Sequence, residues 1–377
     1  MARNPFIIGE IVQGKHFCPR PELVKILRQN IDAAINTVIM GPRRIGKSSL
    51  VFEATRLEKN HKLLYIDLWG LNNREQLTTA IYREYLNFLS TQGSSIKDIL
   101  KRFAYLRPVV ELDENTGKPK FSVEIKEDQR TPTTITEALE LLGKSGEKHK
   151  LVVCFDEFQQ LLTFPESENL MALMRSTIQR LRTPAFVFTG SIRRSMHEIF
   201  LSLKNPFFKS AEIIEVAPLK KNDFYKFTQK KFQEDNRNFP KETATAILEI
   251  SNGITEDAFQ LCSSIWNITE AGETITEETS RTALLRILAQ EDSTNRHLFN
   301  LLKSTQKKVL YGLARSGGNA PTSKEFLKSS NIPQPSSVST ALKRLTQLDL
   351  IYHHDGEYKF FSPFFRYWLL EKSNFQV

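Results

Sequence analysis

The sequence is poor in cysteine and lacks a long uncharged apolar segment. Its three cysteines, Cys18, Cys154 and Cys262, are far apart and fall in no metal-ligand spacing. This scattered, odd-numbered set indicates neither a disulfide framework nor a zinc site, and it fits a reducing cytoplasm best. Even the most apolar stretch, Phe360 to Leu370, is short and carries Arg366. The sequence therefore predicts an unsecreted, cytoplasmic protein without a membrane span.

Internal repeats and long low-complexity tracts are absent from the sequence, and its composition is that of a globular protein. Of the 377 residues, 40% are hydrophobic and 25% are charged, and 26 phenylalanines are available to fill cores. This length predicts two or three domains. The net charge of +9 favours acidic partners, with nucleic acid first among them.

Between Thr37 and Val216, short apolar runs alternate with helical patterns, which indicates a parallel sheet covered by helices. The predicted strands are Thr37 to Met40, Leu63 to Leu68, Leu151 to Phe155, Ala185 to Thr189 and Glu212 to Val216. The segment 100–131 interrupts this rhythm with a polar turn and predicts an inserted β-hairpin or flap. We assign residues 1–217 to this α/β domain.

Two further regions follow the α/β domain. Residues 218–292 carry four helical patterns and predict a small lid domain. Its predicted helices are Lys221 to Glu234, Lys241 to Ser251, Glu256 to Thr269 and Glu277 to Ala289. Residues 293–377 show three helices and then two strands joined by Asp355-Gly356, which is the element order of a winged helix.

The expected recognition helix of the winged helix, Ser336 to Leu348, is polar and basic. From Leu301 to Val377 there are eleven Lys or Arg residues against five Asp or Glu residues. Ser337, Lys343 and Arg344 are DNA-contact candidates, because hydroxyl and basic side chains suit phosphates and base edges. The alternative is a winged helix that packs against the α/β domain or against a partner protein.

The clearest motif is G-x-x-x-x-G-K-S, from Gly41 to Ser48, which stands between a strand and a helix. Gly41 opens the turn and Gly46 lets the backbone approach closely, so that N–H groups point at an anion. Lys47 would reach the β and γ phosphates of a nucleoside triphosphate, and the Ser48 hydroxyl would ligate Mg²⁺. A surface turn with a solvated lysine is the alternative. The predicted nucleotide-binding residues of this loop are Gly41, Pro42, Arg43, Arg44, Ile45, Gly46, Lys47, Ser48 and Ser49.

A second motif, Leu151 to Phe158, ends an apolar strand in two carboxylates. We predict that Asp156 holds the metal ion and that Glu157 polarises the attacking water. A carboxylate directly after the metal-binding aspartate favours an ATPase over a GTPase switch. The sequence also has no guanine-reading Asn-Lys-x-Asp stretch. ATP is therefore the expected nucleotide.

The next predicted strand carries polar residues at its tip. Thr189 and Ser191 are candidates for sensing the γ phosphate, although Ser191 equally suits a helix N-cap. Arg193 and Arg194 follow, and either is a candidate arginine finger that acts in cis or across a subunit interface. Solvated arginines are the alternative. The predicted catalytic residues are Glu157, Lys47 and Arg193.

The order of these motifs resembles the archaeal-type ATPase family, a prokaryotic group in the STAND class of P-loop ATPases, near the origin-recognition and other AAA-like ATPases. The segments that carry the resemblance span nearly the whole chain and read NPF, HFCPRPEL, GPRRIGKSSL, LVVCFDEF, FTGSIRRSM, NPFFKSAEII and SPFFRYWLL. The resemblance implies a P-loop core of the type with an additional strand and a catalytic glutamate, a helical lid and a C-terminal winged helix. It also implies that ATP and Mg²⁺ are held between core and lid.

The same resemblance implies roles for residues outside the two motifs. Phe17, Pro19 and Arg20 match the family's entry motif and would line the base pocket, with Pro19 in place of the usual acidic residue. Lys209 stands where the family often has arginine and is a further sensor candidate. In the lid, Gly253 to Thr255 lacks the proline that the family places against the base.

Three classes of function fit these predictions. The first is an ATP-driven switch whose nucleotide state regulates a protein or DNA partner. The second is a DNA-remodelling or DNA-loading ATPase of replication or mobile-element type. The third is a nucleotide-stabilised DNA-binding regulator with little turnover. The sequence identifies neither the partner nor the oligomeric state.

Overall fold

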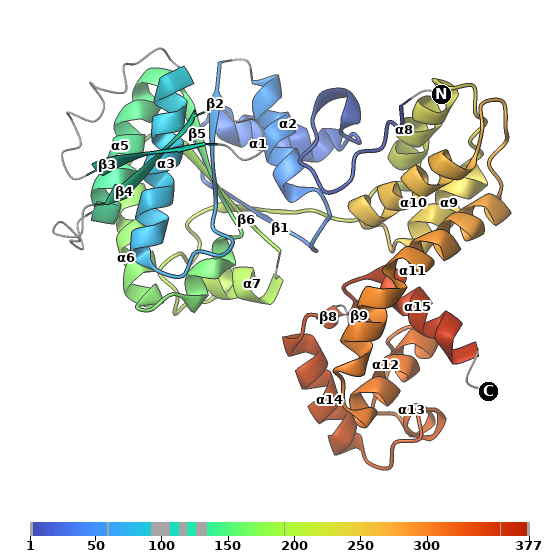
Figure 1. The fold of residues 1–377 in the computed structure, drawn as a ribbon. Coiled ribbons are helices and arrows are strands. Elements are labelled where there is room, and N and C mark those ends of the chain that lie inside the picture. The colour runs from blue at the N-terminus through green and yellow to red at the C-terminus, as the bar shows by residue number, and fades with distance from the viewer. Residues whose placement is uncertain are drawn as a thin grey trace. The chain divides into compact units, whose positions relative to one another are not determined.

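The computed structural model describes residues 3–58, 60–91, 106–112, 119–125, 134–191, 193–354 and 356–374. The chain forms two compact units (Figure 1). One consists of Ile11–Ala217, and the other of Met1–Glu10 together with Pro218–Val377. Within these described ranges, no helix is both long and apolar enough to cross a membrane.

The first unit is built on a five-stranded parallel sheet, as the apolar runs predict. Its strands are β1 (Thr37–Met40), β2 (Lys62–Asp67), β5 (Leu151–Asp156), β6 (Ala185–Gly190) and β7 (Glu212–Glu215). Their order is β2-β5-β6-β1-β7, and every neighbouring pair is parallel. All residues of β1, β5 and β6 are buried, as expected for strands with helices on both faces of the sheet.

Helices cover both faces of this sheet (Figure 1). On one face lie α1 (Pro21–Asp32) and α2 (Lys47–Leu57), and on the other lie α3 (Arg74–Thr91), α5 (Thr134–His149) and α6 (Ser167–Ile178). The described part of this unit also contains three shorter helices: η1 (Gly14–His16), η3 (Phe158–Thr163) and α7 (Arg193–Leu201). Phenylalanines pack the core beside η3, where the Phe158 ring lies 4.7 Å from Phe188 and 5.3 Å from Phe207.

An antiparallel pair of strands interrupts the parallel sheet pattern, in the region where we expect an inserted hairpin or flap. β3 (Leu106–Leu112) pairs with β4 (Pro119–Ile125) in a continuous register from Leu106 opposite Ile125 to Leu112 opposite Pro119. The other residues of 100–131 lie outside the described part of the chain.

The second unit begins with the helices expected for the lid. They are α8 (Lys221–Gln233), α9 (Lys241–Ile250), α10 (Thr255–Ile268) and α11 (Glu277–Asn300). The N-terminal segment packs here and not on the α/β domain to which we assigned it. Phe6 is buried with its ring 5.1 Å from Phe232 and 6.0 Å from Phe259, and Asn4 donates to the Ser263 carbonyl. Burial of the Phe6 ring among these lid residues explains why the N-terminal segment belongs to the second unit and not, as we predicted, to the first.

Helix α11 also changes the expected boundary at residues 292 and 293. It does not end near Ala289 but continues to Asn300, so one helix crosses from the lid into the winged helix. The stretch holds no glycine or proline to stop the helix, and Asp292 pairs with Arg296 one turn later at 2.6 Å. The lid and the winged helix consequently belong to one compact unit.

The winged helix has the predicted element order and ends in a helix that we did not predict. Its elements are α12 (Ser304–Ser316), α13 (Lys324–Ser329), α14 (Pro335–Gln347), β8 (Ile351–His354), β9 (Glu357–Phe360) and α15 (Pro363–Asn374). β8 and β9 pair antiparallel, and Gly356 between them has φ 84°. Asp355 lies outside the described residues. Helix α15 is fastened to α12 by Arg366, whose Nε donates to the Ala314 carbonyl at 3.0 Å.

Candidate active site

The loop between β1 and α2 has the backbone that its two glycines predict, for two different reasons. Gly46, at the N-cap of α2, has φ 93°, a left-handed conformation that disfavours side chains. Gly41 is needed for close approach, because a Cβ there would lie 2.8 Å from the backbone carbonyl oxygen of Val216, the residue after β7. Arg44 adopts φ 61° without being glycine. The loop therefore wraps tightly around the N-terminus of α2.

The ammonium group of Lys47 lies inside this loop. Its Nζ donates to the Pro42 carbonyl at 2.9 Å and to the Gly41 carbonyl at 3.3 Å, and only 6% of the residue is exposed. Burial lowers the pKa of Lys47 to about 8, although the nearby carboxylates of Glu157 and Asp156 favour its charged form. The structure thus places one cation and two carboxylates at the start of α2.

Asp156, at the end of β5, accepts hydrogen bonds from four groups. The Ser48 hydroxyl donates to Oδ2 at 2.6 Å, and the Tyr65 hydroxyl donates to the same oxygen. The Thr189 hydroxyl and the Glu157 backbone N–H donate to Oδ1, the latter at 2.9 Å. The carboxyl ends of parallel strands meet at one edge of a sheet, so β2, β5 and β6 bring these side chains together.

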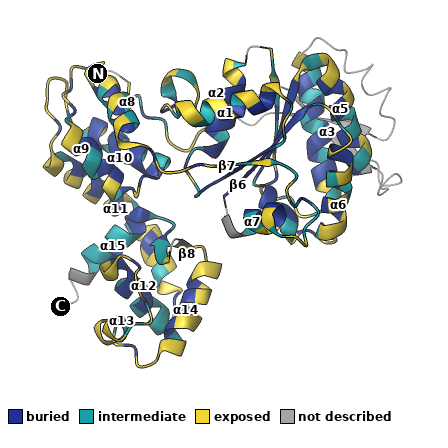
Figure 2. Ribbon diagram, turned by 180° about the vertical axis from the view of Figure 1, so that it is seen from behind, coloured by how far each residue is buried: buried dark blue, intermediate teal, exposed yellow. Residues whose placement is uncertain are grey.

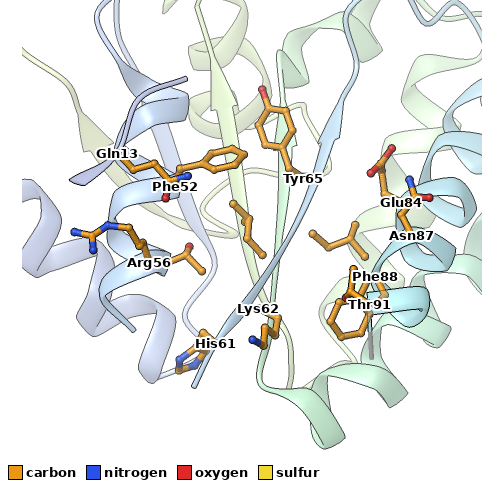
Figure 3. A pocket seen from close by; sticks show the side chains of 13 residues that line it. Gln13, Phe52, Arg56, His61, Lys62, Tyr65, Glu84, Asn87, Phe88 and Thr91 are labelled. Carbon is orange, nitrogen blue, oxygen red and sulfur yellow. Dashed lines mark hydrogen bonds between the residues drawn. The ribbon is translucent and has the colours of Figure 1, made fainter. Parts of the chain in front are cut away.

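Tyr65 is a site residue that sequence reasoning missed. It occupies a strand position where an aromatic residue suggests only packing, and its ring does lie 5.2 Å from Phe52. Burial and the Asp156 carboxylate raise the pKa of Tyr65, so its hydroxyl stays protonated and can donate at neutral pH. Figure 3 shows Tyr65 in the wall of a cavity of about 510 Å³ beside β2, between α2 and α3.

Glu157 follows Asp156 in a left-handed backbone conformation, with φ 51°. Its Oε2 accepts a hydrogen bond from the Ser191 hydroxyl at 2.7 Å and another from the Gln159 amide nitrogen. This contact with the carboxylate is neither of the two roles that we predicted for Ser191, and its role as a γ-phosphate sensor stays a prediction; α7 begins at Arg193. Gln159 was not predicted, because a glutamine three residues beyond a strand looks like a surface residue.

A further carboxylate and an exposed tryptophan lie at the end of β2. Asp67 is opposite Asp156 in the strand register, and burial raises the pKa of Asp67, with Asp156 and Glu157 acting in the same direction. Its Oδ1 accepts from the Trp69 backbone N–H at 2.9 Å. The Arg43 guanidinium lies 5.4 Å from the centre of the Trp69 ring, so a cation–π contact holds this loop arginine.

Residues 21–261 match the family model of an ATPase domain predominantly from Archaea. The chain belongs to this family. Residues 293–371 match a second model, that of a probable winged helix domain. No curated protein matches the chain at a significant level. The resemblance found in the sequence motifs is confirmed, as are the P-loop ATPase core and the C-terminal winged helix.

Two solved structures share the fold over nearly their whole length. The Walker-type ATPase paby2304 of Pyrococcus abyssi has a TM-score of 0.65 and 19% identity, and the match covers 97% of this chain and 99% of that chain. The ORC2 protein of Aeropyrum pernix, solved in ADPNP–ADP complexes, has a TM-score of 0.56 and 14% identity, covering 100% and 99%. At identities of 19% and 14%, the similarity to these two structures shows a shared fold.

In this member of the archaeal ATPase family, the segment before α1 is bonded to the phosphate loop and to α2. The backbone N–H of Val12 donates to Ser49 Oγ at 3.1 Å. Arg20 donates to the Ile45 carbonyl at 3.2 Å and to the Ala217 carbonyl at 2.6 Å, and burial lowers the pKa of its guanidinium. Of the base-pocket candidates beside it, Phe17 is buried and Pro19 is exposed.

The sensor and arginine-finger candidates Lys209, Arg193 and Arg194 are not tested by the described contacts. Lys209 is exposed, and its ammonium lies 5.4 Å from the centre of its neighbour Phe208. Arg193 begins α7, and its side chain and that of Arg194 lie outside what the structure describes. Their predicted roles as sensor and arginine finger stay predictions.

Proposed function

We propose that this protein hydrolyses ATP with Mg²⁺ and uses the nucleotide state as a switch. The convergence on Asp156 carries the proposal, because Ser48, Tyr65 and Thr189 reach one point from three separate elements. Lys47 would anchor the β and γ phosphates, and the backbone N–H groups of the loop would bind their oxygens. Glu157 would accept a proton from the attacking water.

The side chains around Asp156 suit Mg²⁺. Within the described ranges, no three His, Cys, Asp and Glu side chains are grouped so that they alone could hold a metal ion. Mg²⁺ needs no such cage, since proteins bind it with one or two carboxylates, substrate phosphates and water. The Ser48 hydroxyl and the Asp156 carboxylate, joined at 2.6 Å, would hold it. When bound, the ion would neutralise charge on the β and γ phosphates.

Two variants test the assignment of binding and hydrolysis. Glu157→Gln is expected to bind Mg–ATP and to lose turnover, because the amide cannot accept the proton. Lys47→Ala is expected to lose ATP binding while the protein remains folded. Equilibrium binding of a fluorescent ATP analogue and phosphate release measure the two effects. Turnover by Glu157→Gln equal to that of the wild type would remove the role of Glu157, and unchanged affinity in Lys47→Ala would remove that of Lys47.

The switch role is supported by how the chain passes between its two units. It passes once at residues 10–11 and once at residues 217–218. Inside the first unit, Val12 is bonded to Ser49 of α2, and the Ala217 carbonyl accepts from Arg20, which also bonds to the phosphate loop at Ile45. Both connections are therefore bonded to the elements that would respond to a bound triphosphate.

Fluorophores on Glu168 of α6 and Lys328 of α13 would test the switch. We expect energy transfer between them to differ between ATP-bound Glu157→Gln and the ADP complex. Arg20→Gln should reduce this difference. Arg28→Gln, which removes an ion pair between α1 and Glu58 at the end of α2, should preserve it. Equal transfer in the ATP and ADP complexes would contradict the switch and leave the hydrolysis proposal intact.

DNA is a second candidate partner, because α14 presents an exposed polar and basic side (Figure 2). Its apolar residues Val338, Ala341, Leu342 and Leu345 are buried, whereas Lys343 and Arg344 are exposed and Ser337 is half-buried. Lys343→Glu with Arg344→Glu should weaken duplex binding and flatten its salt dependence, by about one unit of slope for each lost phosphate contact. Absence of wild-type binding at low salt, with and without ATP, would leave a protein as the partner of this unit.

A further inference from the structure

We propose that Gln159 is a positioning residue that sets the orientation of the Glu157 carboxylate. This inference rests on the proposed hydrolysis of ATP and names how the water-activating group of that site is held. The Gln159 amide nitrogen donates to Oε2 of Glu157 and, at 3.3 Å, to Ser191 Oγ. Ser191 Oγ itself donates to the same Oε2 at 2.7 Å. The three side chains therefore form a closed ring of hydrogen bonds.

Both donors bind one oxygen of the carboxylate and leave the other unused. Among the described residues, no donor contacts Oε1 of Glu157. A carboxylate held by one oxygen presents the other in a fixed direction, which is what a general base needs to accept a proton from a bound water. Ser191 alone would leave the carboxylate free to rotate about a single hydrogen bond, and Gln159 adds the second point that fixes it.

The backbone around Gln159 holds its side chain in place. Glu157 is in a left-handed conformation, and η3 begins at Phe158, so the chain turns back immediately after β5. Phe158 is fully buried, with its ring 4.7 Å from Phe188 and 5.7 Å from Phe200. Gln159, the next residue, is 6% exposed. The aromatic core thus anchors the turn that aims the amide at Glu157.

The other end of the Gln159 amide marks it as more than a packing residue. Its Oε1 is buried and has no hydrogen-bond partner among the described residues. A Cβ added at Gly190 would lie 2.6 Å from this oxygen and closer still to Met196, so the glycine leaves space that the amide shares with Met196. An unpaired buried acceptor costs stability, so its presence in a native protein calls for an explanation beyond packing. An apolar side chain of the same length would avoid this cost.

Gln159→Met tests the proposal, and Gln160→Met is the matched control. Methionine keeps the length of glutamine and removes both hydrogen bonds to the ring. Gln160 is adjacent but donates to the Leu71 carbonyl and to Thr163, away from Glu157. We expect Gln159→Met to lower kcat about tenfold to a hundredfold and to keep KM for ATP within about twofold. Gln160→Met should match the wild type in both.

A double variant separates positioning from a general structural effect. Because Gln159 acts through Glu157, Glu157→Gln with Gln159→Met should be no slower than Glu157→Gln alone. A multiplicative further loss, or wild-type turnover in Gln159→Met, would overturn the proposal. Thermal unfolding of each variant shows whether it is folded.

Crystal structures of the wild type and Gln159→Met supply a readout independent of turnover. Oε2 of Glu157 is expected at hydrogen-bond distance from Ser191 Oγ in the wild type and displaced in Gln159→Met. A carboxylate that keeps its position in the variant would overturn the inference. If the wild type hydrolyses no ATP, the proposed function fails, and the two structures still decide whether Gln159 orients Glu157.

Discussion

The hydroxyl of Ser48 donates a hydrogen bond of 2.6 Å to Asp156, joining the first turn of α2 to the end of β5. The two residues are 108 positions apart in the sequence. Their contact depends on the parallel order β5-β6-β1 in the sheet, which brings the carboxyl ends of these strands to one edge. In the proposed complex with Mg–ATP, Ser48 and Asp156 would give up this hydrogen bond and bind the same Mg²⁺ ion instead.

The first prediction concerns the Mg²⁺ dependence of nucleotide binding. We expect the wild type to bind ATP more tightly with Mg²⁺ than with EDTA, and Ser48→Ala to lose most of this difference because a hydroxyl ligand is removed. Calorimetric titration in both conditions measures it. Ser49→Ala removes a neighbouring hydroxyl that accepts from Val12, and it should retain the Mg²⁺ dependence even if affinity itself changes. Equal Mg²⁺ dependence in Ser48→Ala and wild type would exclude Ser48 as a ligand.

The sequence predicts those parts of the site that follow from strand ends and glycine-rich turns. Ser48, Asp156 and Thr189 meet because each stands directly at the end of an apolar run or at the start of the helix after it. Tyr65 and Gln159 were not predicted, because their roles depend on the direction in which their side chains point. A strand tyrosine and a glutamine after a strand have no distinctive pattern, and only the left-handed turn at Glu157 and the packing of Phe158 aim Gln159.

Helix ends were also predicted imperfectly in the second unit, for a physical reason. The pattern Glu277 to Ala289 is amphipathic, but α11 continues to Asn300 through residues that are mostly polar. Contacts with α15, which is distant in sequence, support this continuation: Trp368 donates to Asp292 at 2.8 Å. Local periodicity carries no signal of such a partner.

The second prediction concerns Tyr65, which supports Asp156 from the neighbouring strand. Tyr65→Phe removes one of four donors to the carboxylate. Groups that orient a metal ligand typically contribute about tenfold to a hundredfold to metal affinity, so we expect the apparent Mg²⁺ affinity of the ATP complex to fall about tenfold. Tyr85→Phe is the control, since Tyr85 lies in the core beside Phe88 on α3. Unchanged Mg²⁺ affinity in Tyr65→Phe would show that the other three donors suffice.

The third prediction separates backbone strain from nucleotide binding. Gly46 and Gly272 have φ of 93° and 89°, and a Cβ on either would meet no atom within 4 Å. Alanine at each position should therefore destabilise its unit by a similar amount, about 1 kcal/mol, or about 2–4 °C in Tm. Only Gly46→Ala should also weaken ATP binding, because the strain lies in the phosphate loop. Equal ATP affinity of the two variants would contradict the assigned role of this loop.

The last prediction concerns pH and the contact between α11 and α15. Asp292 accepts from Arg296 at 2.6 Å, from Trp368 at 2.8 Å and from Lys372 at 3.0 Å. These donors, Arg296 foremost, lower the pKa of Asp292 below its ordinary value of 3.8. A carboxyl whose pKa is lower in the folded state stabilises the fold above its unfolded pKa, and this contribution is lost as the pH falls through the folded pKa.

Asp292→Asn should therefore unfold at a lower temperature than the wild type at pH 7. The difference in unfolding temperature between the two proteins should narrow as the pH falls below 3.8. Glu291→Gln is the control and should show a smaller change at pH 7, because among the described residues the Glu291 carboxylate accepts from Gln260 alone, at 3.3 Å. A gap between Asp292→Asn and wild type that stays constant from pH 7 to pH 3 would mean that the three donors do not act through the ionised carboxylate.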